Sequence, residues 1–576
     1  MTAESFIQQK AAQAIQAIYG TEVAETSLQV SVTRKEFEGD YTLVTFPLLK
    51  ISRQAPDVTG NAIGAWLVDN VKEIAAYNSV KGFLNLQFSP LYWNECLQGI
   101  AADPSFGVLP ATGKRIMVEF SSPNTNKPLH LGHIRNNLLG DSVSRILKAC
   151  GNEVIKATLV NDRGVHICKS MYAWEKLFDG KTPESTGIKG DHLVGDCYVA
   201  YAKLEKEHPE VIDDVHKMLV KWEEGDPHVR ELWTMMNGWV FQGFDETYRA
   251  LGISFDKVDY EHDTYLLGKE LVQKGLDMGV LVRDPDGSVW CDLTADGLDR
   301  KLVLRGDGTS VYITQDLGTA ERRFAQYNLD SHVYVVGNEQ DYHFQVLKLI
   351  LGKLGFDWAS RIYHLSYGMV ELPEGKMKSR EGTVVDADDL IQSMYEEAKK
   401  TSEESGKLAD ISDQEKEKLY HMIGLGALKY FIIKVDPKKT MLFNPKESID
   451  FNGNTGPFIQ YTHARICSIL RKATVAFGAE DIKADAQPSA KEIRLTQLLS
   501  LYPGKVGEAG AALSPAIIAN YAYELAKEFN QYYHETPILK EEDPSVLKYR
   551  LELIDTLART LRSAMGLLGI QLPERM

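Results

Sequence analysis

Two histidines that flank a glycine are the first residues in this sequence whose types and spacing could do chemistry. They lie in the stretch SSPNTNKPLHLGHIRNN as His130 and His133, with Gly132 between them and Lys127 three residues before the first. The preceding letters IMVEFSS predict a β-strand, and the pattern that follows predicts a helix starting near His133. A helix N-terminus behind a strand of a parallel sheet attracts anions, because its unpaired N–H groups and its dipole face the ligand.

These nitrogen-bearing side chains predict a site that stabilises a triphosphate while negative charge develops at phosphorus. Gly132 would let the ligand approach the backbone closely. The sequence contains neither GxGxxG nor GxxxxGK[ST], so no glycine-rich phosphate loop is expected. A pair of histidines that only caps the helix is the alternative, since a four-residue pattern is a weak signal.

A basic segment further along the chain is the second candidate. KMKSREGTVV contributes Lys376, Lys378 and Arg380 directly after the last run that we interpret as a parallel strand. Strand carboxyl ends in open α/β sheets face the ligand crevice, so this loop is expected to reach the same phosphates. Taken by itself, such a segment is more often a solvated surface loop.

The elements that must position these residues follow an α/β pattern. RIMVEF and EVIKATLV are short apolar runs separated by a helical pattern from Ile134 to Cys150, which predicts a βαβ unit and a parallel sheet. HVYVVG and IYHLSYGMV are later runs of the same kind. We therefore predict a Rossmann-type catalytic domain over residues 112–385, with a charged, helical insertion at about 165–290.

Length and pattern predict further domains on either side. A chain of 576 residues is long enough for about three or four domains. Residues 1–105 mix a helix with short alternating segments and predict an α+β domain, which ends at the Pro/Gly-rich ADPSFGVLPATGK. Residues 386–440 read as a helical connector with a charged, solvated part. Residues 441–576 read as helical and predict an all-α helical-bundle domain.

Composition excludes several classes of protein. The net charge of −16 argues against a nonspecific DNA-binding protein, although a local basic patch could still meet RNA. The cysteines contain no CxxC pair, so we expect neither a zinc cluster nor disulfides, and the cysteine usage fits a reducing cytoplasm. The N-terminus lacks the basic and apolar regions of a signal peptide, and no apolar run is long enough to span a bilayer. We expect a cytoplasmic protein without membrane partners.

Several motifs together resemble one family. HLGH resembles the HIGH signature of class I aminoacyl-tRNA synthetases, and KMKSR resembles their KMSK signature. EFSSPNTNKPLHLGHIRNNLLGD, VNDRGVHICKS, GDHLVGDCYV, SVYITQDLGTAERR, VYVVGNEQDYHF and GPFIQYTHARICSILRK resemble arginyl-tRNA synthetases, in that family's order and over essentially the whole chain. One departure is that Ser379 stands where the class pattern ends its loop with a lysine. The resemblance implies that Lys127 replaces that lysine.

The resemblance implies roles for individual residues. The implied catalytic residues are His130, His133, Lys127, Lys376, Lys378 and Arg380. The implied ATP-binding residues are Asn126, Pro128, Leu131, Gly132, His343, Met377 and Ser379. The implied arginine-binding residues are Glu119, Ser121, Asn124, Tyr312, Asp316 and Gln340. The implied tRNA-binding residues are Tyr461, His463, Arg465 and Arg471, in what resembles the family's anticodon-binding domain.

The resemblance also implies a two-step reaction. The carboxylate of L-arginine attacks the α-phosphorus of ATP, and a terminal ribose hydroxyl of tRNA(Arg) then takes the arginyl group. ATP is expected to arrive with Mg²⁺ as a substrate, without a structural metal in the protein. Recognition of a planar guanidinium requires carboxylates in bidentate geometry, for which Asp316 beside Tyr312 is the implied candidate. We expect a monomer that meets tRNA at its elbow through the N-terminal domain.

Three other interpretations compete with this one. A small-molecule nucleotidyltransferase with HxGH would be shorter and would lack an all-α tail. A cysteinyl-tRNA synthetase would need zinc-ligating cysteines at suitable spacing, and the cysteines of this sequence do not have that spacing. A degenerate paralogue that only binds RNA would be expected to lose signature residues, yet His130, His133 and Lys127 are all present.

Overall fold

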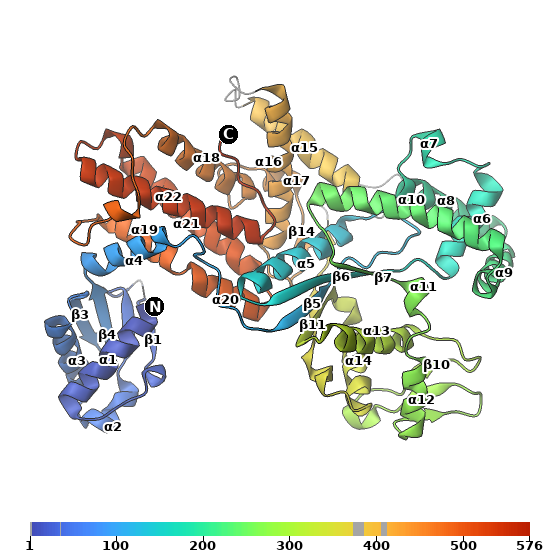
Figure 1. Cartoon of the computed structure of the whole chain (residues 1–576), viewed down its shortest axis with the longest axis horizontal. Coiled ribbons are helices and arrows are strands. Elements are labelled where there is room, and N and C mark those ends of the chain that lie inside the picture. Colours follow the sequence, from blue (N-terminus) through green and yellow to red (C-terminus); the bar gives the residue numbers. More distant parts are fainter. Residues whose placement is uncertain (1–2, 35, 372–384, 405–411) are drawn as a thin grey trace.

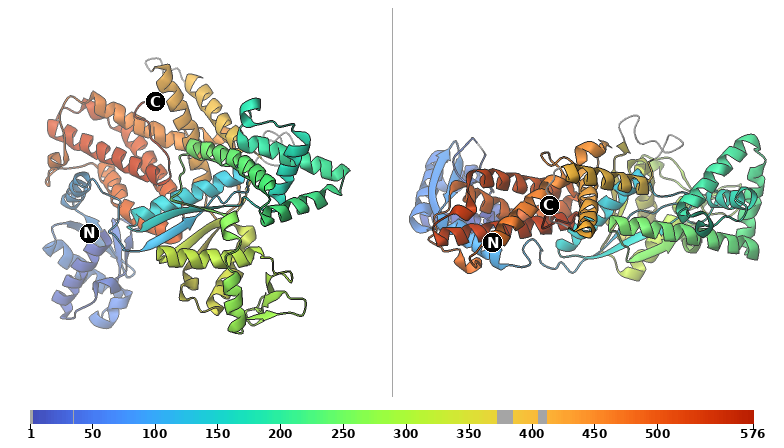
Figure 2. Two further views of the ribbon diagram at one scale, coloured as in Figure 1. Left: turned by 45° about the vertical axis from the view of Figure 1, so that its right-hand side comes forward. Right: turned by 90° about the horizontal axis from the view of Figure 1, so that it is seen from above.

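The computed structural model describes residues 3–34, 36–371, 385–404 and 412–576. Figure 1 shows a central parallel sheet, with the N-terminal unit and the C-terminal helices toward one end and a group of helices at the other. Seen from above in Figure 2, the molecule is long and shallow, with the same two ends far apart. Among the described residues, no helix combines the length and apolar character needed to cross a membrane.

The N-terminal unit is an α+β domain, as the alternating segments predict. Its four strands form an antiparallel sheet in the order β1-β2-β4-β3. The elements are α1 (Ala3–Tyr19), β1 (Val30–Val32), β2 (Tyr41–Val44), α2 (Leu49–Ser52), α3 (Pro56–Asn70), β3 (Ile74–Val80), β4 (Phe83–Phe88) and α4 (Pro90–Ala102). The side-chain amide of Asn94 on α4 donates to the carbonyls of Ala484 and Ala486, which ties this unit to the C-terminal helices.

The central sheet is the Rossmann-type core of the chain. Its five strands lie in the order β12-β11-β5-β6-β7, and all neighbouring pairs are parallel. The strands are β5 (Arg115–Glu119), β6 (Glu153–Val160), β7 (Lys257–Tyr260), β11 (Ser331–Gly337) and β12 (Ile362–Tyr367). Because parallel strands end at the same edge, the loops after β5, β6, β7 and β11 meet there.

Helices cover both faces of this sheet because successive residues of a strand point in opposite directions. Val118 on β5 packs into the core that includes α5 (Leu131–Ala149), whereas its neighbour Met117 packs into a second core with α13 (Tyr312–Tyr327) and α14 (Asp341–Lys353). α5 also contacts helices of the C-terminal bundle. The predicted Rossmann-type parallel sheet is therefore confirmed, and helices cover both of its faces.

The predicted helical insertion is wrong at its carboxyl end. The helices are α6 (Val165–Leu177), α7 (Pro183–Thr186), α8 (Gly190–Glu207), α9 (Val211–Glu224) and α10 (Pro227–Leu251). The chain then returns to the sheet, because β7 pairs in parallel with the end of β6. The segments α11 (Glu261–Thr264), α12 (Lys269–Asp277), β8 (Leu281–Arg283), β9 (Val289–Cys291) and β10 (Lys301–Leu304) follow, and the last three strands form a small antiparallel sheet.

The C-terminal region is almost entirely helical, as the sequence predicts. Two short strands, β13 (Val370–Glu371) and β14 (Met441–Leu442), pair in parallel, so the predicted all-α region begins with a strand. The helices are α15 (Ala387–Glu404), α16 (Asp413–Ile433), α17 (Pro445–Ser448), α18 (Gly456–Lys472), α19 (Ala490–Ser500), α20 (Tyr502–Ala512), α21 (Ala516–Glu535) and α22 (Pro544–Leu567). α16 contacts both α5 and α18, so the connector joins the sheet domain to the bundle.

Candidate active site

The two histidines of HLGH cap the start of α5 through their Nδ1 atoms. His130 is the N-cap residue, and its Nδ1 accepts the backbone N–H of Gly132 at 3.1 Å. Nδ1 of His133 accepts the backbone N–H of His130 at 3.2 Å. Since each Nδ1 is an acceptor, each neutral ring carries its proton on Nε2. Capping and chemistry are therefore compatible: one nitrogen of each ring holds the helix, and the other can donate to a ligand.

Both imidazoles stay neutral at physiological pH. Burial, followed by the nearby charge of Lys127, lowers the pKa of His130 to about 4. Burial, followed by the nearby His130 and Lys127, holds the pKa of His133 well below its ordinary value of 6.5. Protonation at Nδ1 would also break the hydrogen bonds that cap α5. The helix start thus offers two neutral Nε2–H donors and, at Lys127, one exposed ammonium.

This low pKa has a consequence for stability. Between pH 6.5 and 4 the unfolded chain binds a proton at His130 that the folded protein does not, so stability falls as the pH drops through that window. We expect the melting temperature of His130→Asn to fall less between pH 7 and pH 5 than that of the unmodified protein, by about 2 °C. Calorimetry at the two pH values measures this difference. Equal falls for both proteins would contradict the assignment.

The turn between β5 and α5 has a strained backbone. Ser121 and Ser122 both have left-handed conformations, with φ of 72° and 45°. Hydrogen bonds hold them: Ser121 N–H donates to Oδ1 of Asn136 at 2.6 Å, and Ser122 N–H donates to Oγ1 of Thr158 at 3.1 Å. Strain of this kind clusters where a ligand must be held. Asn124, which follows the turn, is exposed and forms a parallel bridge with Asn161.

Other residues predicted to bind ATP surround the helix start. Asn126 and Leu131 are buried, and Pro128 is half-buried. Pro128 packs so close to Gly195 of α8 that a Cβ on that glycine would lie 2.8 Å from its Cδ. The insertion therefore supports the strand-to-helix turn from outside the sheet.

The segment that follows KMKSR lies against HLGH. Lys376, Met377, Lys378, Ser379 and Arg380 themselves lie outside the described residues. The backbone N–H of Leu131 donates to the carbonyl of Val385, and that of Ala387 donates to the carbonyl of Leu129, both at 2.9 Å. These two bonds straddle His130. Arg380 stands five positions before Val385 in the sequence.

Three of the residues predicted to recognise arginine, Tyr312, Asp316 and Gln340, lie on α13 or just before α14. Tyr312 is the first residue of α13 and is 76% exposed. Asp316 lies one turn later on the same helix, as the spacing predicts, and its Oδ2 contacts Nε2 of His343 at 2.6 Å. His343 belongs to α14, and Gln340 is an exposed residue just before that helix. Asp316 is half-buried, so its carboxylate is accessible to a cationic ligand.

A buried ion-pair network underlies the sheet edge. Arg323 on α13 is 1% exposed and donates from NH1 to Glu119, the last residue of β5. Its Nε and NH2 donate to Oδ2 of Asp259 on β7 at 3.1 and 2.8 Å. Burial alone would raise the pKa of Asp259, but Arg323 and the neighbouring cations bring it below its usual range. Glu119 also accepts from Ser122 Oγ at 3.1 Å, so this carboxylate joins the strained turn to α13.

Replacing Arg323 by methionine is expected to cost about 3–5 kcal/mol of stability, because the buried carboxylate of Glu119 would lose its cation and that of Asp259 would lose its fully buried one. The matched control is Arg322→Met. Arg322 contacts the same Asp259 at 3.0 Å, but its side chain is one-third exposed, and about 1 kcal/mol or less is expected. Urea unfolding of both variants provides the comparison. Equal losses would contradict a central role for Arg323.

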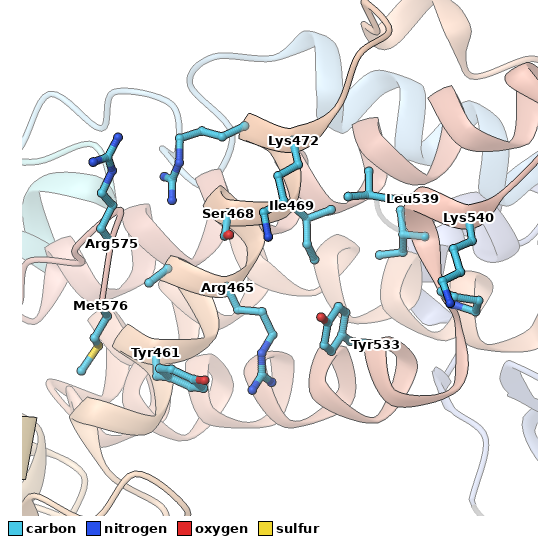
Figure 3. A pocket seen from close by; sticks show the side chains of 14 residues that line it. Tyr461, Arg465, Ser468, Ile469, Lys472, Tyr533, Leu539, Lys540, Arg575 and Met576 are labelled. Atoms are coloured by element: carbon cyan, nitrogen blue, oxygen red, sulfur yellow. The ribbon is translucent and has the colours of Figure 1, made fainter. Parts of the chain in front are cut away.

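The residues predicted to contact tRNA divide into two groups. Tyr461, Arg465 and Arg471 on α18 line an open pocket of about 800 Å³ (Figure 3). The guanidinium of Arg465 lies over the rings of Tyr461 and Tyr533, 4.8 and 5.1 Å from their centroids. Lys472, Lys540 and Arg575 also line this pocket, and no acidic residue does so among those described. The pocket thus combines aromatic faces with cations, as stacking on unpaired bases requires.

His463 is the exception, and its predicted contact with tRNA is wrong. The side chain is fully buried, and its Nδ1 contacts the carbonyl of Pro573 at 2.9 Å. Burial, which outweighs that hydrogen bond, lowers its pKa. His463 holds the C-terminal tail of the chain against α18. His463 lies two residues from both Tyr461 and Arg465, and two residues along a helix correspond to about half a turn, so its side chain points to the opposite side of α18.

Sequence reasoning missed several residues of these sites. Arg323 stands within the quoted motif SVYITQDLGTAERR, but no local signal marks it as buried. Tyr533, Lys540 and Arg575 come from other segments than α18, and only the bundle's packing brings them into one pocket. An alternating or helical pattern reports on one element and cannot reveal partners from another.

The parallel sheet, the histidine-capped start of α5 and the helical insertion define a class I aminoacyl-tRNA synthetase. Residues 100–444 match the family described as tRNA synthetases class I (R), catalytic domain. Residues 459–576 match the DALR anticodon binding domain. The chain belongs to the arginyl-tRNA synthetase family.

Individual relatives agree with this assignment. The chain is 56% identical to the arginine–tRNA ligase of Bacteroides thetaiotaomicron, with 98% of both chains covered. It is 54% identical to the arginine–tRNA ligase of Flavobacterium psychrophilum, with 95% of this chain and 96% of the relative covered. The solved structure of Thermus thermophilus arginyl-tRNA synthetase is similar with a TM-score of 0.82 at 26% identity, and both chains are covered in full.

Proposed function

We propose that this chain joins L-arginine to the 3′ end of tRNA(Arg) in two steps. In the first, the arginine carboxylate attacks the α-phosphorus of ATP, and pyrophosphate leaves as the arginyl-adenylate forms. In the second, a terminal ribose hydroxyl attacks the adenylate carbonyl, and AMP leaves. One observation carries the proposal: in a chain of this family, the capped start of α5 and the Asp316–His343 pair lie beyond strand ends of one parallel sheet.

The first step requires donors more than a general base, because charge moves onto the phosphates and the arginine carboxylate is already ionised. We assign this role to the Nε2–H groups of His130 and His133 and to the ammonium of Lys127. MgATP is the substrate form, and the metal travels with the phosphates. Lys376, Lys378 and Arg380 are proposed as further cations for the pyrophosphate.

Selection of arginine is assigned to Asp316, with Tyr312 and Gln340 beside it. A guanidinium is planar and permanently charged, so a carboxylate and nearby acceptors distinguish it from neutral side chains. Asn124 and Glu119 are proposed to hold the α-amino and carboxylate end of the substrate. Glu119 already forms an ion pair with Arg323. Its remaining lone pairs can still accept a hydrogen bond from the substrate's α-amino group, which supports a role for Glu119 in orienting the substrate.

Contacts with tRNA are assigned to two regions. The pocket around Tyr461, Arg465 and Arg471 is proposed to take anticodon bases, and the N-terminal unit to meet the elbow. The net charge of −16 disfavours binding of RNA by the protein as a whole. Binding should therefore depend on local basic groups in these two regions and weaken as the salt concentration rises. We propose that the protein acts as a monomer in the cytoplasm.

Pyrophosphate exchange with each of the twenty amino acids, with and without tRNA(Arg), tests the function. Exchange with arginine alone is the expected result. If exchange also requires tRNA, the RNA completes the site; if it does not, the protein site suffices. Absence of exchange with arginine in both conditions, from folded protein, would overturn the proposal.

A further inference from the structure

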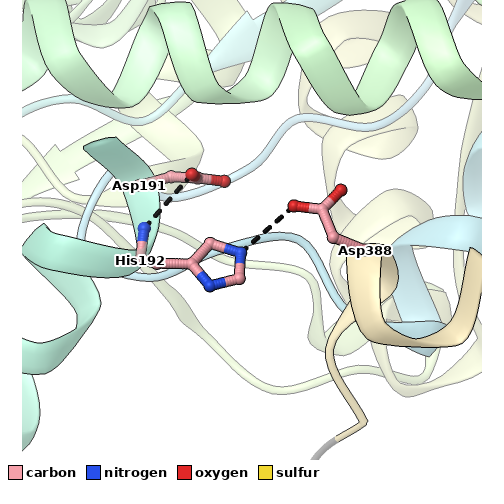
Figure 4. Close-up of side chains that lie close together, drawn as sticks. All are labelled: Asp191, His192 and Asp388. Carbon is pink, nitrogen blue, oxygen red and sulfur yellow. Dashed lines mark hydrogen bonds and ion pairs between the residues drawn. The ribbon is translucent and has the colours of Figure 1, made fainter. Parts of the chain in front are cut away.

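A cluster of charged side chains joins the helical insertion to the start of α15 (Figure 4). Nζ of Lys189, just before α8, lies 2.6 Å from Oδ2 of Asp388 on α15 and 2.6 Å from Oγ1 of Thr247 on α10. Thr247 Oγ1 in turn donates to the other oxygen of Asp388 at 2.8 Å. Nε2 of His192 on α8 lies 3.1 Å from Oδ2. One carboxylate therefore receives three donors from the insertion.

The spacing of this cluster also suits a metal ion, but its chemistry does not. Ligand atoms of Asp191, His192 and Asp388 lie within 4.8 Å of one another. The ammonium of Lys189, however, lies 2.6 Å from Asp388 and 3.4 Å from Asp191, so the cluster already contains its cation. The hydrogen bond that His192 donates to Asp388, opposed by burial, raises the pKa of His192 to about 9, which adds a second positive charge at neutral pH.

The cluster is closely packed on its buried side. Asp191 is fully buried and accepts the backbone N–H of His192 at 3.1 Å. Gly243 of α10 packs so closely that a Cβ there would lie 2.3 Å from Oδ1 of Asp191. α8 and α10 therefore pack closely at this point, and Asp388 contacts side chains from both helices and from the residue before α8.

Asp388 lies directly after the residues that pair with HLGH. Ala387 donates to Leu129 and Val385 accepts from Leu131, on either side of His130. Oδ1 of Asp386 accepts the backbone N–H of Asp388 at 2.8 Å, which caps α15. Displacing Asp388 would therefore shift residues 385–387, and with them the backbone that flanks His130.

We propose that Lys189, His192 and Thr247 are positioning residues for ATP: through Asp388 they hold residues 385–387 in register with the histidine-capped start of α5. None of them needs to touch the substrate. The inference rests on the proposed function and deepens it: residues of the helical insertion would position the ATP site for the formation of the adenylate. Arginine recognition, which is assigned to α13, should depend on the cluster far less.

Lys189→Met and Asp388→Asn test the proposal in pyrophosphate exchange, with ATP and arginine varied separately in the presence of tRNA(Arg). We expect kcat/KM for ATP to fall about tenfold or more, since small displacements near reacting groups are costly. KM for arginine should change less than about threefold. The double variant should lose no more than either single variant, because the two residues act as one unit.

Asp389→Asn is the matched control, because this neighbouring carboxylate is exposed and only its backbone bonds to the cap. It should retain the kinetics of the unmodified protein. A parallel loss for ATP and arginine, or an equal loss in Asp389→Asn, would overturn the proposal. If Lys189→Met does not fold, Thr247→Val removes the two hydrogen bonds of Oγ1 with Lys189 and Asp388 and should still lower kcat/KM for ATP selectively. Absence of exchange in the unmodified protein would instead reject the proposed function.

Discussion

Replacing Asp316 by asparagine is expected to lower kcat/KM for arginine by about 10³-fold. A guanidinium stays charged at every accessible pH, so loss of its carboxylate leaves a desolvated cation unpaired, at a cost of about 2–5 kcal/mol. Asparagine has nearly the same shape and can still hydrogen-bond to His343, which contacts Asp316 at 2.6 Å. The change therefore removes the charge while the local packing is kept.

Pyrophosphate exchange at varied arginine concentration, with tRNA(Arg) and saturating ATP, measures this effect. Glu321→Gln is the control, because it removes a carboxylate from the same helix, more than one turn beyond Asp316. The control should differ from the unmodified protein less than about twofold. Unchanged kcat/KM in Asp316→Asn would show that another group pairs with the guanidinium.

Replacing His130 by alanine is expected to lower kcat for exchange by about 10²–10³-fold. Removal of one donor that acts on charge in the transition state typically has an effect of this size. Alanine also removes the N-cap of α5, which should destabilise the protein by about 1 kcal/mol. Activity and stability are thus both expected to fall, for separate reasons.

His130→Asn separates the two roles. Asparagine is a good N-cap and can accept the N–H of Gly132, so the melting temperature at pH 7 should stay close to that of the unmodified protein. It has no donor at the position of Nε2, so the loss of kcat should persist. Full activity in His130→Asn would mean that the imidazole serves only as a cap, which was the alternative that the short motif left open.

Local patterns predicted the elements that carry the chemistry. The spacing in VYITQD predicted Tyr312 and Asp316 one turn apart, and both lie on α13. Short apolar runs predicted β5 and β11, and each strand is apolar along its length because it packs residues into both layers. β7 was not predicted from the sequence, because it is four residues long and lies at the edge of the sheet, where only one of its residues is buried.

The family, the reaction class and the candidate catalytic residues could all be predicted from the sequence, because these depend on short motifs in a fixed order. How those residues are held and charged depends on contacts between distant segments of the chain. The low pKa of His130 comes from burial, and the partners of Arg323 and Asp388 come from distant strands and helices. Lys189 and Asp388 are 199 residues apart in the chain, so their contact depends on packing that no local pattern encodes.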